Sequence, residues 1–177
     1  MITNRVLTIP NALTFLRILL VPFFLFAMNS KDYSIALKIV IFAGITDGLD
    51  GLIARKFNQT SKIGIFLDPL ADKMLLLSVM VSFYIHELAP RWFILLVLTR
   101  DMLVAIGWVE TYLTKKKISK PTMLGKISSA SQVIIFGYIL FSINFSVPQV
   151  PPLGYYLVSF LSIISLVQYL IIRFSDE

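Results

Sequence analysis

Apolar residues gather along the chain in six long runs that are separated by short polar links. The runs cover roughly residues 12–28, 33–54, 63–86, 91–114, 124–145 and 153–173. A helix needs about 20 mostly apolar residues to cross the hydrocarbon core of a bilayer, and each run is near that length. The pattern therefore predicts an all-α integral membrane protein with six transmembrane helices. The stretch MITNRVLTIP before the first run predicts a short N-terminal interfacial segment.

Composition and link length both favour a single membrane domain. Hydrophobic residues make up 57% of the 177 residues, and the mean hydropathy is +0.83. A soluble domain is only about 45–50% apolar. The links are too short for a separate soluble domain, so we expect residues 1–177 to form one membrane domain. The first run lacks a clear cleavage site, which favours a retained helix. The absence of cysteine excludes disulfides and thiol catalysis.

The net charge of +6 is informative through its distribution along the chain. If the N-terminus is cytoplasmic, the cations outside the spans fall on the cytoplasmic side, except Lys31 and Arg91. The positive-inside rule then places both termini in the cytoplasm, in a multi-pass protein of the cell inner membrane. These basic residues lie beside membrane ends, where anionic lipid headgroups are the nearer partner. We therefore expect membrane lipids as partners and no nucleic acid.

Four aspartates interrupt the apolar pattern in the segment ITDGLDGLIARKFNQTSKIGIFLDPLADK, residues 45–73. Asp47 and Asp50 are spaced i, i+3, and Asp68 and Asp72 are spaced i, i+4, so each pair shares one face of a helix. The two helices follow one another through a short link and must run antiparallel. We therefore expect the two pairs to face each other at one level, about 12 Å from the cytoplasmic helix ends.

Four carboxylates at this depth need compensating charge. One ionised aspartate in the middle of a membrane costs about 2.5–3.5 kcal/mol, and four would also repel one another. The nearby cations Arg55, Lys73 and Arg100 would convert the site into inert salt bridges. Oxygen ligands without histidine or cysteine select hard divalent ions such as Mg²⁺, Mn²⁺ or Ca²⁺. Four carboxylates on two helices fit a two-metal site.

Small residues accompany the aspartates on the first of these helices. Gly51 and Ala54 share the face of Asp47 and Asp50, and Arg55 follows directly. Small residues there indicate either close helix packing or space for a flat ligand against the helix. Arginine offers a planar fork that matches phosphate. Metals, a phosphate-binding arginine and a bare helix face together suggest a nucleotide diphosphate.

The spacing of these residues resembles a known family signature. The segment reads Asp47-x2-Asp50-Gly51-x2-Ala54-Arg55-x8-Gly64-x3-Asp68-x3-Asp72, which is eight fixed positions over 26 residues. It resembles the complete signature of the CDP-alcohol phosphotransferase family, also called CDP-alcohol phosphatidyltransferases. The predicted six-span layout resembles that family too, so the likeness extends over nearly the whole chain.

The resemblance implies roles for the eight positions. Asp47, Asp50 and Asp68 would ligate the metals, expected to be two Mg²⁺ or Mn²⁺ ions, and Asp72 would complete the site. Asp72 would also be the general base that takes the proton of the acceptor hydroxyl. That hydroxyl would attack the CDP-linked phosphate, and CMP would leave. The CDP moiety would be bound by the remaining positions of the signature, namely Gly51, Ala54, Arg55 and Gly64.

The resemblance also bears on the substrates and on assembly. The stretches IPNALTFLRILLVPFF and GIFLDPLADK resemble the branch of phosphatidylglycerophosphate synthases and cardiolipin synthases. This branch implies CDP-diacylglycerol as donor and a glycerol-type acceptor. Homodimers are common in the family, so a homodimer is a possible assembly. A divalent cation transporter is the alternative from another class, because intramembrane acids also mark ion pathways. It would more often show inverted repeats, and none is visible.

The fourth run informs the choice of acceptor. Family members that use glycerol 3-phosphate typically carry Arg-Glu, followed by a second arginine eight residues after the first. Here Arg100 is followed by Asp101, and Trp108 stands at the second position. This slightly favours phosphatidylglycerol, the acceptor of cardiolipin synthases, and leaves glycerol 3-phosphate as the alternative. Arg100 and Lys126 are the candidate acceptor-binding residues. Because neighbouring helical side chains point about 100° apart, we do not expect Arg100 and Asp101 to pair.

Overall fold

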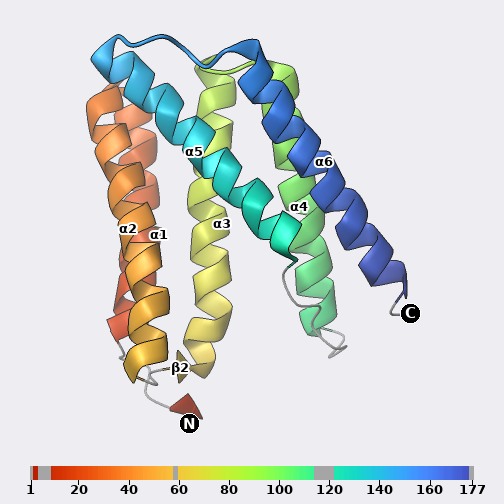
Figure 1. The fold of residues 1–177 in the computed structure, drawn as a ribbon. Coiled ribbons are helices and arrows are strands. Elements are labelled where there is room, and N and C mark those ends of the chain that lie inside the picture. The colour runs from red at the N-terminus through yellow and green to blue at the C-terminus, as the bar shows by residue number, and fades with distance from the viewer. Residues whose placement is uncertain (1, 4–8, 58–59, 114–121, 176–177) are drawn as a thin grey trace. The chain divides into compact units, whose positions relative to one another are not determined.

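The computed structural model describes the backbone of residues 2–3, 9–57, 60–113 and 122–175 (Figure 1). Within these ranges, some residues are described by their backbone alone and the others with their side chains. The residues described by backbone alone are 2–3, 9–11, 13, 47–57, 60–70, 72, 112–113 and 174–175.

Six long helices account for nearly all of the described chain. They are α1 (Ile9–Asn29), α2 (Tyr33–Phe57), α3 (Lys62–Ile85), α4 (Arg91–Leu113), α5 (Met123–Phe145) and α6 (Pro152–Ser175). Each coincides with one predicted apolar run, and the ends differ by at most three residues. The prediction of six helices is therefore confirmed. Pro10 occupies the first turn of α1, where its missing N–H costs no hydrogen bond.

A short pair of strands is an exception to the predicted all-α pattern. Strand β1 (Ile2–Thr3) pairs in parallel with β2 (Thr60–Ser61), with Ile2 opposite Thr60. β1 lies within the predicted interfacial segment. A strand signal needs an alternating run of four to eight residues, so a two-residue pairing leaves no trace in the sequence.

The described helices differ in how much of their length is apolar enough for a membrane span. By length and composition, three described segments could cross a bilayer: Arg91–Thr111, Met123–Phe145 and Pro152–Arg173. In the first half of the chain the described apolar segments are shorter, at Thr14–Asn29, Tyr33–Thr46 and Lys73–Ile85. The chain is thus a predominantly helical membrane protein with three segments, among its described residues, that are long and apolar enough to span a bilayer.

The chain divides into two compact units, each with its own interior. The first unit comprises Met1–Ser82 and Ile143–Ser146. In it α1 and α2 form an antiparallel hairpin (Figure 1). The hairpin turns at Lys31, whose φ is 57°, and Asp32 caps α2 by accepting a hydrogen bond from the Ile35 N–H at 3.0 Å. Side chains that are almost fully buried line the hairpin, namely Phe24, Ala27, Met28, Ala36 and Ala43.

The second unit comprises Phe83–Ser142 and Val147–Glu177, and aromatic rings fill one end of it. Phe83 meets Phe136 edge-on at a centroid distance of 5.1 Å, and Phe93 meets Tyr155 at the same distance. Trp92 stacks on Tyr156 at 5.3 Å. These rings join the beginnings of α4 and α6 to α5 and the end of α3.

On α4, Gly107 faces two side chains of α6. An ideal Cβ built on Gly107 would lie 1.9 Å from the Tyr169 hydroxyl and 2.3 Å from Arg173 Nη1. Arg173 also forms an ion pair with Glu110 of α4. The missing side chain of Gly107 thus allows the C-terminal part of α6 to lie directly on α4.

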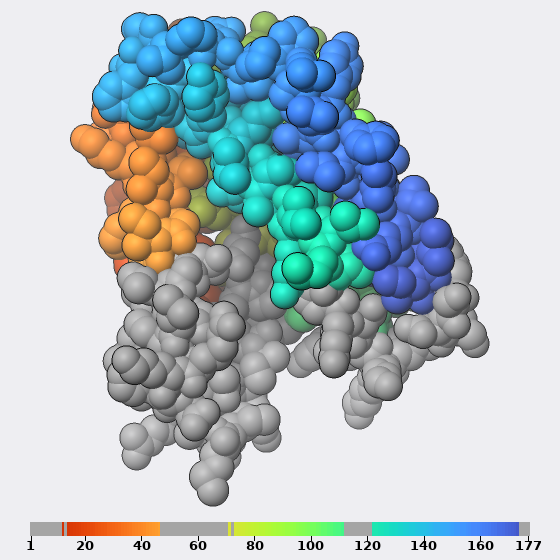
Figure 2. All heavy atoms as spheres, in the orientation of Figure 1, coloured from red at the N-terminus to blue at the C-terminus, as the bar shows by residue number. Residues whose placement is uncertain are grey.

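The distribution of side chains on α6 is the reverse of that in a soluble helix. Ser159, Ser162 and Ser165 are buried, at 5%, 0% and 1% exposure. Large apolar side chains of α6 are exposed, namely Leu153, Leu157, Phe160, Ile163, Val167 and Ile171. The helix is the blue segment of the surface in Figure 2. Exposed apolar side chains together with hydroxyls on the packed face are expected when the surrounding solvent is lipid.

Candidate functional site

The predicted metal and CDP residues lie on two consecutive helices. Asp47 and Asp50 belong to α2, together with Gly51, Ala54 and Arg55, and Asp68 and Asp72 belong to α3, together with Gly64. Each aspartate pair thus lies within one uninterrupted helix, as the i, i+3 and i, i+4 spacings require. The side chains of these eight residues are outside the described part of the structure, so their mutual arrangement stays a prediction.

The buried face of α2 leads toward the aspartate positions. Ala36, Ile39, Ala43 and Thr46 are all buried and follow one another at intervals of three or four residues. The Thr46 hydroxyl donates to the Ala43 carbonyl at 2.9 Å, so its polar group is satisfied within the helix. In α3, Ala71 is fully buried directly before Asp72. The described parts of both helices therefore turn small side chains inward next to the signature.

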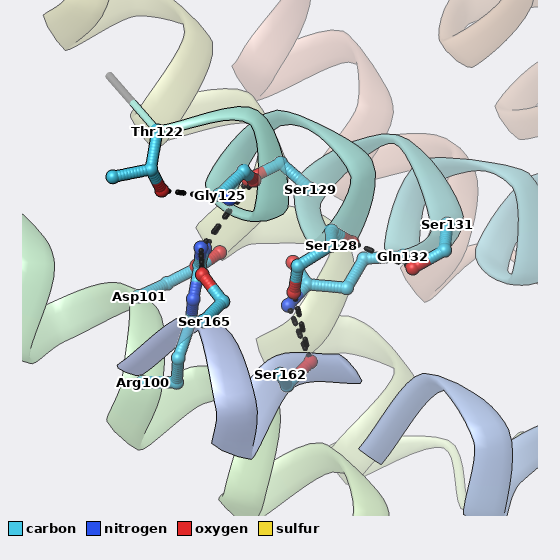
Figure 3. Close-up of polar contacts among 10 residues, drawn as sticks. All are labelled: Arg100, Asp101, Thr122, Gly125, Ser128, Ser129, Ser131, Gln132, Ser162 and Ser165. Atoms are coloured by element: carbon cyan, nitrogen blue, oxygen red, sulfur yellow. Dashed lines mark hydrogen bonds and ion pairs between the residues drawn. The ribbon is translucent and has the colours of Figure 1, made fainter. Parts of the chain in front are cut away.

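A second polar group, in the other unit, surrounds Arg100. We call Arg100, Asp101, Gly125, Ser129 and Ser165 the Arg100 cluster; its members come from α4, α5 and α6 (Figure 3). Arg100 and Asp101 are 4% and 1% exposed. The Arg100 guanidinium donates from Nη1 to Asp101 Oδ1 at 2.5 Å and to Ser129 Oγ at 3.2 Å. From Nη2 it donates to Ser165 Oγ at 2.7 Å and to the Gly125 carbonyl at 3.4 Å.

The expectation that Arg100 and Asp101 do not pair is wrong. Their ion pair is direct and buried. The 100° between adjacent helical positions separates the Cβ directions, but the long arginine side chain can bend back along the helix surface to the neighbouring carboxylate. An isolated buried charge is costly, and the pairing removes most of that cost. The predicted acceptor-binding role of Arg100 remains a prediction.

The first turn of α5 is fixed on both sides of Lys126. Thr122 precedes the helix, and its hydroxyl accepts a hydrogen bond from the Gly125 N–H at 3.0 Å, which is a typical N-cap. The Thr122 carbonyl accepts the Lys126 N–H at 3.1 Å. Lys126 itself is exposed. Its ammonium group can therefore meet a phosphate from outside the unit, whereas Arg100 is enclosed.

Further hydroxyl groups extend the polar contact between α5 and α6. Ser128 and Ser162 share a hydrogen bond at 3.1 Å, and Gln132 donates to Ser162 Oγ at 3.2 Å (Figure 3). Sequence reasoning did not single out these serines or Ser165. On α6 the available signal was the three-residue spacing of Ser159, Ser162 and Ser165 in the apolar run SFLSIISL, because polar residues recurring on one face of a membrane helix mark its packed side.

Comparison with known proteins identifies the family. The model of the CDP-alcohol phosphatidyltransferase family matches residues 7–171. The chain therefore belongs to this family, which confirms the resemblance carried by the signature.

Relatives bear two kinds of name. A cardiolipin synthase (CMP-forming) of Streptomyces coelicolor is 35% identical over 148 residues, covering 79% of this chain and 68% of that protein. A CDP-diacylglycerol–glycerol-3-phosphate 3-phosphatidyltransferase of Haemophilus influenzae is 31% identical over 171 residues, covering 92% and 91%. The chain spans about half of the length of the relatives from Drosophila melanogaster and Homo sapiens, 48% of each. The names of these relatives describe transferases of phospholipid synthesis.

Proposed function

We propose that this protein is a membrane-embedded CDP-alcohol phosphatidyltransferase of phospholipid biosynthesis. It transfers the phosphatidyl group of CDP-diacylglycerol to the hydroxyl of a glycerol-type acceptor and releases CMP. The family match over residues 7–171, which includes the complete signature on α2 and α3, is the observation that carries this proposal. A cation transporter has no need of Gly51, Ala54 and Arg55 at those places.

We favour phosphatidylglycerol as the acceptor, which makes the product cardiolipin. The relatives named cardiolipin synthase from Streptomyces coelicolor and Homo sapiens support this choice, as do Asp101 and Trp108 at the positions discussed above. Glycerol 3-phosphate is the second candidate, because the Haemophilus influenzae relative named for that acceptor matches along 92% of this chain. In either case Lys126, exposed at the start of α5, is the residue that we propose to contact an acceptor phosphate.

The donor set of the signature fits two hard divalent ions. We propose that Asp47, Asp50, Asp68 and Asp72 hold two Mg²⁺ or Mn²⁺ ions, because these are oxygen ligands without histidine or cysteine. When bound, such ions neutralise the pyrophosphate and polarise the phosphorus centre. Buried Ala43, Thr46 and Ala71 support an inward direction for Asp47, Asp50 and Asp68, because each of these aspartates is three or four residues from one of them along its helix.

The residues of the signature then have different roles in the reaction. Arg55 binds the phosphates of CDP, and Gly51, Ala54 and Gly64 leave room for the nucleotide between the helices. Asp72 accepts the proton of the acceptor hydroxyl while the oxygen of that hydroxyl forms the new bond to phosphorus. The bond between that phosphorus and the bridging oxygen breaks, and the electron pair leaves with CMP. Atoms and charge balance without any further reactant.

The topology that we propose has six spans, with both termini and the aspartate site facing the cytoplasm in the cell inner membrane. The charge distribution supports this arrangement, because most cations outside the helices lie on the side of the termini. The three segments in α4, α5 and α6 already satisfy the length and apolarity of a span. The first three helices reach span length when their full extents, 21, 25 and 24 residues, are counted.

The test is an assay of the purified chain with labelled CDP-diacylglycerol and Mg²⁺ or Mn²⁺. We expect metal-dependent CMP release with phosphatidylglycerol and less with glycerol 3-phosphate. Higher activity with glycerol 3-phosphate would replace the favoured acceptor by the second candidate. No CMP release with either acceptor, together with metal flux in proteoliposomes, would support the transporter and end the proposal.

A further inference from the structure

Arg100 directs its terminal guanidinium nitrogens at the protein. The contacts on Nη1 and Nη2 go to one carboxylate, one carbonyl and two hydroxyls, on three different helices. The side chain is 4% exposed, and Asp101 balances its charge within the unit. Of its five N–H donors, the four on Nη1 and Nη2 are matched by these four contacts, and the Nε–H has no hydrogen-bond partner among the described residues. An arginine whose charge is balanced and whose terminal donors are engaged has little left to offer a charged ligand.

One contact of Arg100 goes to the peptide group that joins Gly125 to Lys126. The carbonyl of that peptide group is Gly125 O, which accepts from Arg100 Nη2, and its N–H is that of Lys126, which donates to Thr122 O. The peptide plane is therefore held at both ends. Arg100 also holds Ser129, one helical turn further along α5.

The space around this peptide group is closely filled. An ideal Cβ on Gly125 would lie 3.1 Å from Thr122 Oγ1, and 3.7 Å from both Arg100 Nη2 and Ser165 Oγ. A side chain here would thus be tight only against the Thr122 hydroxyl and in ordinary contact with the guanidinium and the Ser165 hydroxyl. Ser165 makes the shorter contact with Nη2, at 2.7 Å against 3.4 Å for Gly125 O, so α6 fixes the nitrogen that reaches α5.

We propose that Arg100 is a positioning residue for Lys126, held by Ser165, and that it does not itself contact the acceptor. The Arg100 cluster sets the orientation of the first turn of α5, and with it the direction in which the Lys126 ammonium meets the acceptor phosphate. This inference rests on the proposed function, because it assigns Lys126 to the acceptor. It separates the two residues that the sequence placed together as acceptor-binding.

The test uses Ser165→Ala in the full chain, with Ser159→Ala as the matched control. Both serines are buried on α6, but the Ser159 hydroxyl has no hydrogen-bond partner among the described residues and lies outside the cluster. We expect Ser165→Ala to raise the KM for phosphatidylglycerol by roughly threefold to tenfold, with kcat little changed. This change corresponds to the net free energy of one hydrogen bond. Ser159→Ala should leave both constants at their original values.

A double-mutant cycle with Lys126→Ala tests whether Ser165 acts through Lys126. If it does, Ser165→Ala adds no further increase in KM once Lys126 is gone. Additive increases would mean that Arg100 or Ser165 contacts the acceptor independently of Lys126. An unchanged KM in Lys126→Ala would mean that Lys126 does not bind the acceptor, so that Arg100 would have no acceptor-binding residue to position. Either result would overturn the inference.

Hydrogen exchange gives a readout that does not depend on catalysis. The Lys126 amide should exchange several-fold faster in Ser165→Ala than in the original chain, and at the original rate in Ser159→Ala. Equal rates in all three proteins would contradict the inference even if no transferase activity were found. Absence of CMP release with faster exchange in Ser165→Ala would instead count against the proposed function alone.

Discussion

Both compact units carry polar groups within apolar helices, but the groups differ in kind and in how they are supported. In the first unit four acidic residues belong to the consecutive helices α2 and α3, and we propose their carboxylates as metal ligands. In the second unit the terminal nitrogens of Arg100 bond to Asp101 and to hydroxyls of α5 and α6. Charges that are paired within the protein stabilise its structure, whereas the proposed site needs metal ions to hold its carboxylates together. On the proposed function, the first group is a binding site and the second is a structural support.

The largest effect that would sharpen this comparison concerns a single carboxylate. Asp68→Asn should reduce metal-dependent CMP release at least about 100-fold, because a neutral amide is a poor ligand for a hard cation. The purified variant should keep its helix content by circular dichroism. Asp32→Asn is the matched control, because asparagine also caps a helix well and should preserve both fold and activity. Full activity in Asp68→Asn would contradict the assignment of the aspartates.

The second prediction tests whether the other unit depends on its internal ion pair. Arg100→Met should lower the free energy of unfolding by about 3–5 kcal/mol, because it leaves the buried Asp101 without its cation. The measurement is thermal or denaturant unfolding in detergent. The double variant Arg100→Met with Asp101→Leu should recover part of the loss. No recovery would mean that the hydroxyl contacts, and not the charge balance, dominate.

A smaller effect is expected where α6 lies on α4. Gly107→Ala should destabilise the protein by about 1–3 kcal/mol, because its Cβ would overlap Tyr169 and Arg173, which must move. Gly137→Ala in α5 is the control, since its Cβ would meet nothing within 4 Å. There alanine should stabilise the helix by up to about 1 kcal/mol. Equal unfolding midpoints for the two variants would contradict the close approach at Gly107.

The smallest predicted effect concerns acceptor choice. Trp108→Arg should shift the ratio of kcat/KM toward glycerol 3-phosphate over phosphatidylglycerol by a few-fold, about 1 kcal/mol, because it adds a cation near the start of the last turn of α4. Trp108→Lys is the companion variant and should shift the ratio in the same direction but less, since lysine lacks the planar fork. An unchanged ratio in both would remove position 108 from the argument about the acceptor.

The helices and the signature could be predicted because both depend on local spacing. Apolar runs of about 20 residues fix the extents of α1 to α6, and intervals of three and four residues assign Asp47 with Asp50, and Asp68 with Asp72, to common helix faces. Neither inference needs knowledge of which helices meet. The continuity of α2 and α3 through these positions agrees with both.

The Arg100 cluster could not be predicted because it depends on contacts distant in sequence. Arg100 and Ser165 are separated by 65 positions, and only the packing of α6 on α4 and α5 brings them to 2.7 Å. The direct pairing with Asp101 was excluded by a rule about Cβ directions that ignores the reach of a long side chain. The strands β1 and β2 could not be predicted for another reason, because a strand of two residues shows no periodicity.

The outward face of α6 has a practical consequence for making a water-soluble version of the second unit. The buried hydroxyls of Ser128, Ser162 and Ser165 already have hydrogen-bond partners, so the interior could be retained without change. Only the lipid-facing positions would need polar replacements, and on α6 these are Leu153, Leu157, Phe160, Ile163, Val167 and Ile171. The packed side of such a membrane helix could therefore serve as the core of a redesigned protein whose exposed positions are polar.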